Sequence, residues 1–83
     1  MLKKFKLAGC DWTVKSSEIT DCGATDPDRN IIMINNALPP QSQEVTFYHE
    51  LVHAILFTMG ERNHDERFVE GFGQLLYQYA KQL

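Results

Sequence analysis

The sequence predicts an α+β domain in which a short antiparallel sheet of three strands packs against two helices. Residues 1–38 contain short segments with strand-like alternation, separated by turn-forming residues. Residues 41–59 and 65–82 space their apolar side chains as helices do. The chain has 83 residues, which is the size of one domain, so residues 1–83 are expected to form a single unit.

The predicted strands occupy the first part of the chain. Residues 4–7 alternate lysine with Phe or Leu, which indicates a strand with one face in water. A turn at Gly9–Asp11 leads to a second strand at Trp12–Lys15. Asp21–Asn30 is rich in Asp, Gly, Pro and Asn, and we expect a loop there. The apolar, β-branched run Ile31–Ile34 then predicts a buried third strand.

The two predicted helices follow a pair of prolines at residues 39 and 40. Proline suits the first turn of a helix, because its missing N–H would have no partner there, so a helix is expected from Gln41 to Met59. Gly60 is a natural C-terminal stop. The second helix is expected over Asp65–Gln82, with Asn63 as its N-cap.

Each predicted helix carries an apolar stripe that we expect to lie in the core. The stripe of the first helix comprises Val45, Tyr48, Val52, Ile55, Leu56 and Met59, with Phe47 and Leu51 beside it. The stripe of the second helix comprises Phe68, Phe72, Leu75, Leu76 and Tyr79.

The composition disfavours several classes of function. A formal charge of −3 argues against a broad basic surface for nucleic acid. No apolar run approaches the roughly 20 residues that span a bilayer. No apolar stretch of the length found in signal peptides follows the lysine-rich residues Met1–Leu7. A cytoplasmic location without membrane contact is therefore expected. Cys10 and Cys22 lack the spacing of a metal-binding pair, and we expect them to be reduced and semi-buried.

The first predicted helix contains a candidate metal site. His49 and His53 are four residues apart, so a helix places both imidazoles on one face, where they can reach one Zn²⁺. Glu50 follows the first ligand directly and can act beside the metal as a general base. Residues 41–60 contain no Lys or Arg. Because an unpaired buried carboxylate is costly, a positive ion is expected near Glu50.

A catalytic zinc site requires a third protein ligand. The extended pattern with a third histidine six residues after the second is excluded, because Met59 stands there. Glu66 and Glu70 both qualify by position, since they lie one turn apart on the second predicted helix. The residues alone leave open which of the two is the ligand. His64 is a weaker candidate for stabilising an oxyanion, and the alternative is an exposed turn histidine.

Two segments resemble a known family. His49–His53 reads H-E-L-V-H, and Glu66–Gly73 reads E-R-F-V-E-G-F-G. Together they resemble the glutamate-zincins, and over residues 28–80 the chain is similar to the minimal core of ImmA/IrrE-like and small phage-encoded zinc peptidases. The resemblance implies that Glu66 is the third ligand and that Glu70 holds a ligand histidine. It also implies that the strand Ile31–Asn35 lies beside the cleft and binds substrate by strand addition.

These observations predict a zinc metallopeptidase that hydrolyses peptide bonds of a protein or peptide substrate. The predicted site consists of His49, His53 and Glu66 as ligands, Glu50 as general base, and Glu70 as a supporting carboxylate or alternative ligand. The alternative is a non-catalytic zinc-stabilised domain that binds a protein partner, because so small a chain has little material for specificity pockets. An intact Glu50 disfavours that alternative, since a structural zinc site needs no carboxylate at that position.

Overall fold

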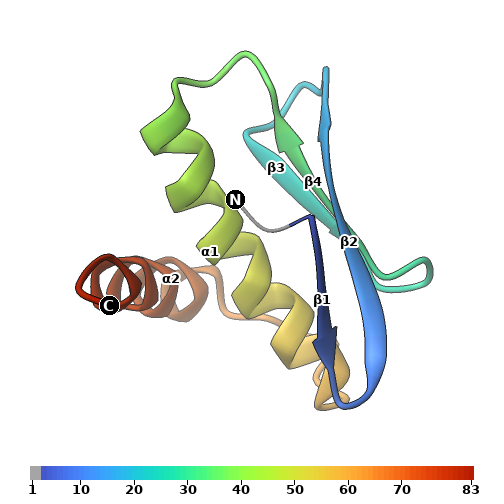
Figure 1. The fold of residues 1–83 in the computed structure, drawn as a ribbon. Helices are drawn as coiled ribbons and strands as arrows, with labels where there is room; N and C mark the ends of the chain where they lie inside the picture. The colour runs from blue at the N-terminus through green and yellow to red at the C-terminus, as the bar shows by residue number, and fades with distance from the viewer. Residues whose placement is uncertain (1–2) are drawn as a thin grey trace.

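The computed structural model describes residues 3–83 and confirms the α+β class (Figure 1). The elements in chain order are β1 (Lys4–Leu7), β2 (Cys10–Ser17), β3 (Gly23–Asp26), β4 (Ile31–Asn35), α1 (Pro40–Thr58) and α2 (Glu66–Lys81). Both helices end within one residue of the predicted positions. No helix in the described part of the chain is long and apolar enough to cross a membrane.

The sheet has four strands in the order β1-β2-β4-β3, so the predicted number of three was wrong. The additional strand, β3, lies inside the segment predicted to be a loop. It pairs antiparallel with β4, from Gly23 opposite Ile34 to Asp26 opposite Ile31. β2 and β4 are parallel, so the sheet is mixed and not purely antiparallel. β3 has only four residues and little apolar character, so its conformation depends on pairing with a neighbour rather than on its own sequence.

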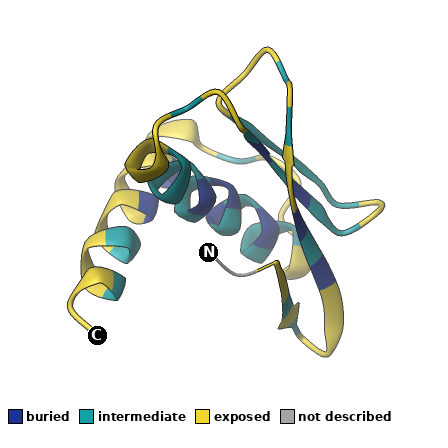
Figure 2. Cartoon of the chain, turned by 45° about the horizontal axis from the view of Figure 1, so that its top comes forward, coloured by how far each residue is buried: buried dark blue, intermediate teal, exposed yellow. Residues whose placement is uncertain are grey.

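The molecule has three layers, with α1 between the sheet and α2 (Figure 1). The core fills the space between α1 and the sheet, and Figure 2 shows that α1 carries several of the buried positions. It consists of Trp12 and Val14 from β2, Ile32 and Ile34 from β4, and Phe47 and Ala54 from α1. Ile32, Ile34 and Ala54 are completely buried. The sheet and α1 therefore share one hydrophobic core.

The second helix packs against α1 through a different face from the one predicted. Val69 and Gly73 are its buried residues, whereas four members of the predicted stripe are exposed: Phe68, Phe72, Leu75 and Tyr79. The sequence of α2 carries two apolar stripes, and a helix of 3.6 residues per turn presents only one of them to α1. Met59 is also exposed, because it lies beyond the end of α1.

The ends of the helices are fixed by local contacts. Gly60 has φ 87°, and the N–H of Glu61 donates to the carbonyl of Leu56, which closes the C-terminus of α1. The N-cap of α2 is Asp65 and not Asn63, because the Asp65 carboxylate accepts from the N–H groups of Arg67 and Phe68. Cys10 and Cys22 are free, and both are exposed rather than semi-buried.

Candidate metal centre

The helical spacing brings the two histidines of α1 to one face, with ring centroids 5.2 Å apart. Glu66, in the first turn of α2, approaches both rings. Its Oε1 lies 3.6 Å from His49 Nε2, and its Oε2 lies 3.3 Å from His53 Nε2. One ligand atom from each residue lies within 4.8 Å of the other two. The structure therefore brings together two imidazoles and one carboxylate.

The donor atoms of this cluster are close enough together to be compared with those of a tetrahedral zinc site. Two atoms that bind one zinc at about 2.0–2.1 Å lie about 3.3–3.4 Å apart in a tetrahedral site. The two nitrogen–oxygen distances at Glu66, 3.3 and 3.6 Å, are close to that value but end on the two different oxygens of the carboxylate, and single ligand atoms of the three residues lie within 4.8 Å of one another. Imidazole nitrogen and carboxylate oxygen are both zinc ligands. The residues present therefore fit a zinc ion.

Glu70 contacts the other nitrogen of one histidine. Its Oε2 lies 2.9 Å from His49 Nδ1, one turn along α2 from Glu66. An ionised carboxylate is only an acceptor, so the His49 Nδ1 must carry the proton. The lone pair of the neutral imidazole is then on Nε2, which faces Glu66. In this tautomer His49 Nε2 is available to a metal, and Glu70 lies where a carboxylate can support a ligand histidine.

Glu50 is the one buried charged residue of the described chain, with 7% of its surface exposed. The hydroxyl of Thr25 donates to its Oε1 at 2.8 Å and also lies 3.1 Å from its backbone carbonyl. No lysine or arginine among residues 3–83 forms an ion pair with Glu50. A buried carboxylate supported by one hydroxyl lacks a positive partner, and a metal ion in the adjacent cluster would supply it.

Thr25 belongs to β3, and the close packing of that strand on α1 depends on Gly23. A Cβ atom on Gly23 would lie 2.6 Å from Thr46 Cγ2 and 3.0 Å from Glu50 Cγ. The absence of a side chain therefore lets β3 approach the helix that carries the site. The sequence did not identify Thr25, because its partner is 25 residues away and its strand read as a loop.

The cleft beside the cluster opens along β3. Two adjoining pockets of about 350 and 510 Å³ both include Glu50, His53 and Glu66 in their walls. β3 is an edge strand, whereas β4 is paired on both sides. The predicted strand addition along Ile31–Asn35 is therefore ruled out, since both edges of that strand are occupied.

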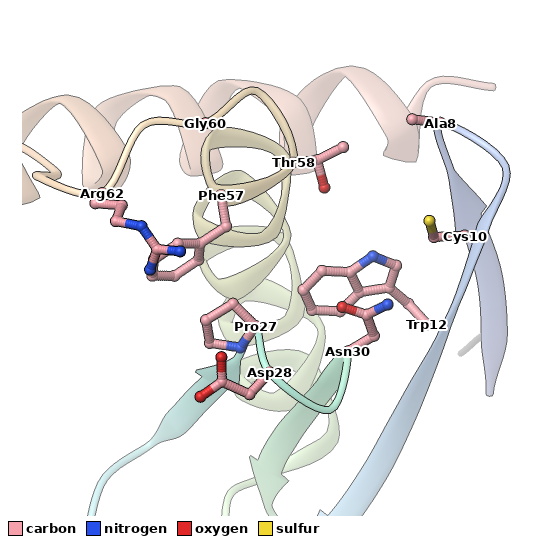
Figure 3. Close-up of a pocket in the computed structure, with 10 residues that line it drawn as sticks. All are labelled: Ala8, Cys10, Trp12, Pro27, Asp28, Asn30, Phe57, Thr58, Gly60 and Arg62. Atoms are coloured by element: carbon pink, nitrogen blue, oxygen red, sulfur yellow. The ribbon is translucent and has the colours of Figure 1, made fainter.

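A third pocket of about 320 Å³ lies between the C-terminal end of α1 and the turns of the sheet (Figure 3). Trp12 and Pro27 line it, and Asn30 and Asp28 lie at the β3–β4 turn that bounds it (Figure 3). Phe57 and Arg62 line both this pocket and the cleft at the metal cluster. The two spaces are therefore neighbours.

His64 is not a member of the metal cluster but contacts it through His53. Its Nδ1 lies 2.7 Å from His53 Nδ1, and its Nε2 lies 2.6 Å from the carbonyl oxygen of Glu61. Both ring nitrogens therefore have close partners, and a contact of His64 with an oxyanion stays a prediction.

A sheet, a helix with the H-E-x-x-H pair and a second helix with a converging glutamate define a zincin-like domain. Within that class the chain belongs to the peptidase family described as the IrrE N-terminal-like domain, which matches residues 13–76. Membership in a metallopeptidase family implies a metal ion, and the two histidines with Glu66 could hold one.

The chain is also similar to the radiation response metalloprotease IrrE of Deinococcus radiodurans. The two are 53% identical over 34 residues, which is 41% of this chain and 10% of that protein. The chain therefore matches about a tenth of the length of this curated relative. No solved structure gave a significant match.

Proposed function

We propose that the domain is a zinc-dependent peptidase that hydrolyses peptide bonds with Glu50 as general base. One observation carries this proposal: a buried carboxylate, Glu50, lies beside a cluster of His49, His53 and Glu66 whose ligand atoms lie within 4.8 Å of one another. A purely structural zinc site needs no buried carboxylate next to its ligands. Family membership supports the same class of reaction.

Each residue has a distinct part in the proposed reaction. His49, His53 and Glu66 would hold the ion, with Glu70 orienting His49. Zinc bound there would act as a Lewis acid on the scissile carbonyl and acidify a water molecule. Glu50 would accept the proton of the attacking water and pass it to the leaving amine. The Thr25 hydroxyl holds one oxygen of Glu50, which leaves the other oxygen for the proton.

The free edge of β3 is the proposed binding site for an extended substrate. The N–H of Asn35 donates to the carbonyl of Cys22 at 2.8 Å, which fixes the alternation of the β3–β4 ladder. By that alternation, the N–H and C=O groups of Gly23 and Thr25 point away from β4. A peptide that pairs with them would run along the cleft and past Glu50. The pocket beyond Phe57 and Arg62 would then receive a substrate side chain (Figure 3).

Glu50→Gln tests the proposal. The amide is nearly isosteric and its oxygen can still accept from Thr25. The zinc content should therefore be unchanged, and the melting temperature should be unchanged or higher. The amide cannot accept a proton from water, so cleavage of an unfolded protein substrate should fall by at least about 10²-fold. His53→Ala is the matched control, because it should lose zinc and activity together.

Two outcomes would contradict the proposal. One is identical cleavage by wild type and Glu50→Gln. The other is the absence of cleavage by either protein while both bind zinc and the same protein partner, which would favour a zinc-stabilised binding domain.

A further inference from the structure

His64 is the one histidine of the chain outside the proposed ligand set, yet both of its ring nitrogens have close partners. Its Nε2 lies 2.6 Å from the carbonyl oxygen of Glu61, and its Nδ1 lies 2.7 Å from Nδ1 of His53. A backbone carbonyl, an imidazole and a second imidazole thus form a chain that ends at a proposed zinc ligand. The proposed reaction has no direct use for His64.

When both imidazole rings are neutral, this series of hydrogen bonds from Glu61 through His64 to His53 allows a single arrangement of protons. A carbonyl oxygen only accepts, so His64 Nε2 must carry a proton and donate it to Glu61. A neutral imidazole has one N–H, so His64 Nδ1 is then an acceptor. The partner of that acceptor, His53 Nδ1, must be the donor. His53 therefore has its proton on Nδ1 and its lone pair on Nε2, which lies 3.3 Å from Glu66 Oε2.

We infer that His64 is a positioning residue that fixes the tautomer and the ring orientation of His53, so that His53 Nε2 is free to bind the metal. The inference rests on the proposed zinc site and deepens it. It gives His53 the counterpart of what Glu70 does for His49, whose Nδ1 donates to a carboxylate at 2.9 Å. The two ligands differ in that one is supported by a charged group and the other by a neutral one.

Packing holds His64 in place. Its ring is nearly parallel to that of His53, with planes 20° apart and centroids 4.9 Å apart, and the two rings meet edge to edge at their Nδ1 atoms. On another side Phe57 packs against it at 4.3 Å. The Glu61 carbonyl, which accepts from His64, belongs to a residue that is itself held in place, because the N–H of Glu61 donates to the Leu56 carbonyl at the end of α1. A residue in the connection between the helices is thereby tied to the rigid end of α1.

The test compares two variants that separate the effect of the hydrogen-bond acceptor of His64, its Nδ1 atom, from the effect of its aromatic ring. His64→Phe keeps an aromatic ring against His53 and Phe57 but removes the acceptor. His64→Asn removes the ring but can place an amide oxygen near the position of Nδ1 and accept from His53. The first measurement is the tautomer of His53 by ¹⁵N NMR in the metal-free full chain. It is made near pH 8.5, about two units above the ordinary imidazole pKa.

We expect His53 to be the Nδ1–H tautomer in wild type and in His64→Asn, and to shift toward Nε2–H in His64→Phe. The second measurement is zinc affinity by competition with a chromophoric chelator. His64→Phe should bind zinc about 10–100-fold more weakly, the usual effect of losing a partner of a ligand histidine, whereas His64→Asn should recover most of that loss.

An Nε2–H tautomer of His53 in the wild-type chain overturns the inference by itself, whether or not the variants fold. Wild-type tautomer and zinc affinity in His64→Phe also overturn it. Because the tautomer is read without metal or substrate, a wild-type chain that binds no zinc, or does not cleave, would reject the proposed function and leave this result separate.

Discussion

Glu66 and Glu70 face one histidine from opposite sides of its ring. Glu66 lies 3.6 Å from His49 Nε2, and Glu70 lies 2.9 Å from His49 Nδ1. They are one helical turn apart and chemically identical, so the difference in their proposed roles comes from the groups that each one meets. Glu66 also reaches His53, and Glu70 instead accepts a hydrogen bond from Gln74.

This difference makes a prediction about zinc affinity. Glu66→Gln should weaken zinc binding more than Glu70→Gln does, because the first removes a ligand charge and the second removes support from a ligand, which costs about 10–100-fold. Competition titrations on the two purified variants measure the order. A larger loss in Glu70→Gln would exchange the roles of the two residues.

The sequence was informative about single residues where the helix alone decides their positions. The spacing of His49 and His53 determines that they share a face, whatever the rest of the chain does. Thr25 could not be found in this way, because its contact with Glu50 arises from strand pairing and from the small size of Gly23. The contact of His64 with His53 depends on the path of the connection between the helices, for which the sequence carries no periodic signal.

At the scale of elements, the two helices pack closely at Gly73. A Cβ atom there would lie 3.0 Å from His49 Cα and 3.2 Å from His49 N, both of which are backbone atoms that cannot rotate away. Gly71, two residues earlier on the same helix, has open space around the position of a Cβ. The same helix thus contains one glycine that the close packing requires and another that lies in open space.

Alanine substitutions should separate these two glycines. Gly71→Ala should stabilise the fold by about 0.5–1 kcal/mol, since alanine is the better helix former and nothing obstructs its side chain. Gly73→Ala should destabilise it and weaken zinc binding, because α2 must move away from His49. Urea unfolding of the zinc-loaded proteins provides the comparison. Equal effects of the two substitutions would show that the helices tolerate separation at Gly73.

The elements differ in how well the sequence predicts them. Both helices are long and have clear apolar periodicity, so their bounds were predicted within a residue, although the N-cap of α2 was assigned to Asn63 and is Asp65. β3 was missed because Gly23–Asp26 has the composition of a turn and becomes a strand only beside β4. The apolar face of α2 was assigned to the wrong stripe, because the residues do not specify which of two apolar faces meets α1.

At the scale of the whole molecule, the proposed zinc ligands come from two different layers. His49 and His53 belong to α1, which packs on the sheet, whereas Glu66 belongs to α2, which packs on the outer side of α1. Besides the packing of Val69 and Gly73, an exposed ion pair of Lys81 with Glu44 at 3.3 Å joins these helices, and that carboxylate raises the pKa of Lys81. A metal ion would thus connect the outer layer to the rest.

Removal of zinc should therefore lower the melting temperature strongly. Each 1 kcal/mol of stability shifts the melting temperature of a domain this size by about 4–8 °C, and metal binding supplies a large share of the stability of small domains. We expect a decrease of at least about 10 °C with chelator, measured by circular dichroism and reversed by added zinc. Melting at one temperature with and without metal would show that the ion does not contribute to folding.

The topology of the sheet was beyond the reach of the sequence. The parallel pairing of β2 with β4 places β3 at the edge, next to the cleft, although β3 precedes β4 in the chain. Strand order depends on which distant segments meet, and the short strands here do not encode their partners.

Trp12 is the one tryptophan of the chain, and its surroundings give it a use as an optical probe. It is 2% exposed, it is stacked on Phe5 with centroids 6.2 Å apart, and the cluster around it contains no residue of α2. Its emission wavelength therefore reports whether the sheet and α1 exclude water, and it is insensitive to the outer helix. If α2 detaches first, helical ellipticity will decrease while the fluorescence remains blue-shifted, and the two signals will resolve the sequence in which the layers come apart.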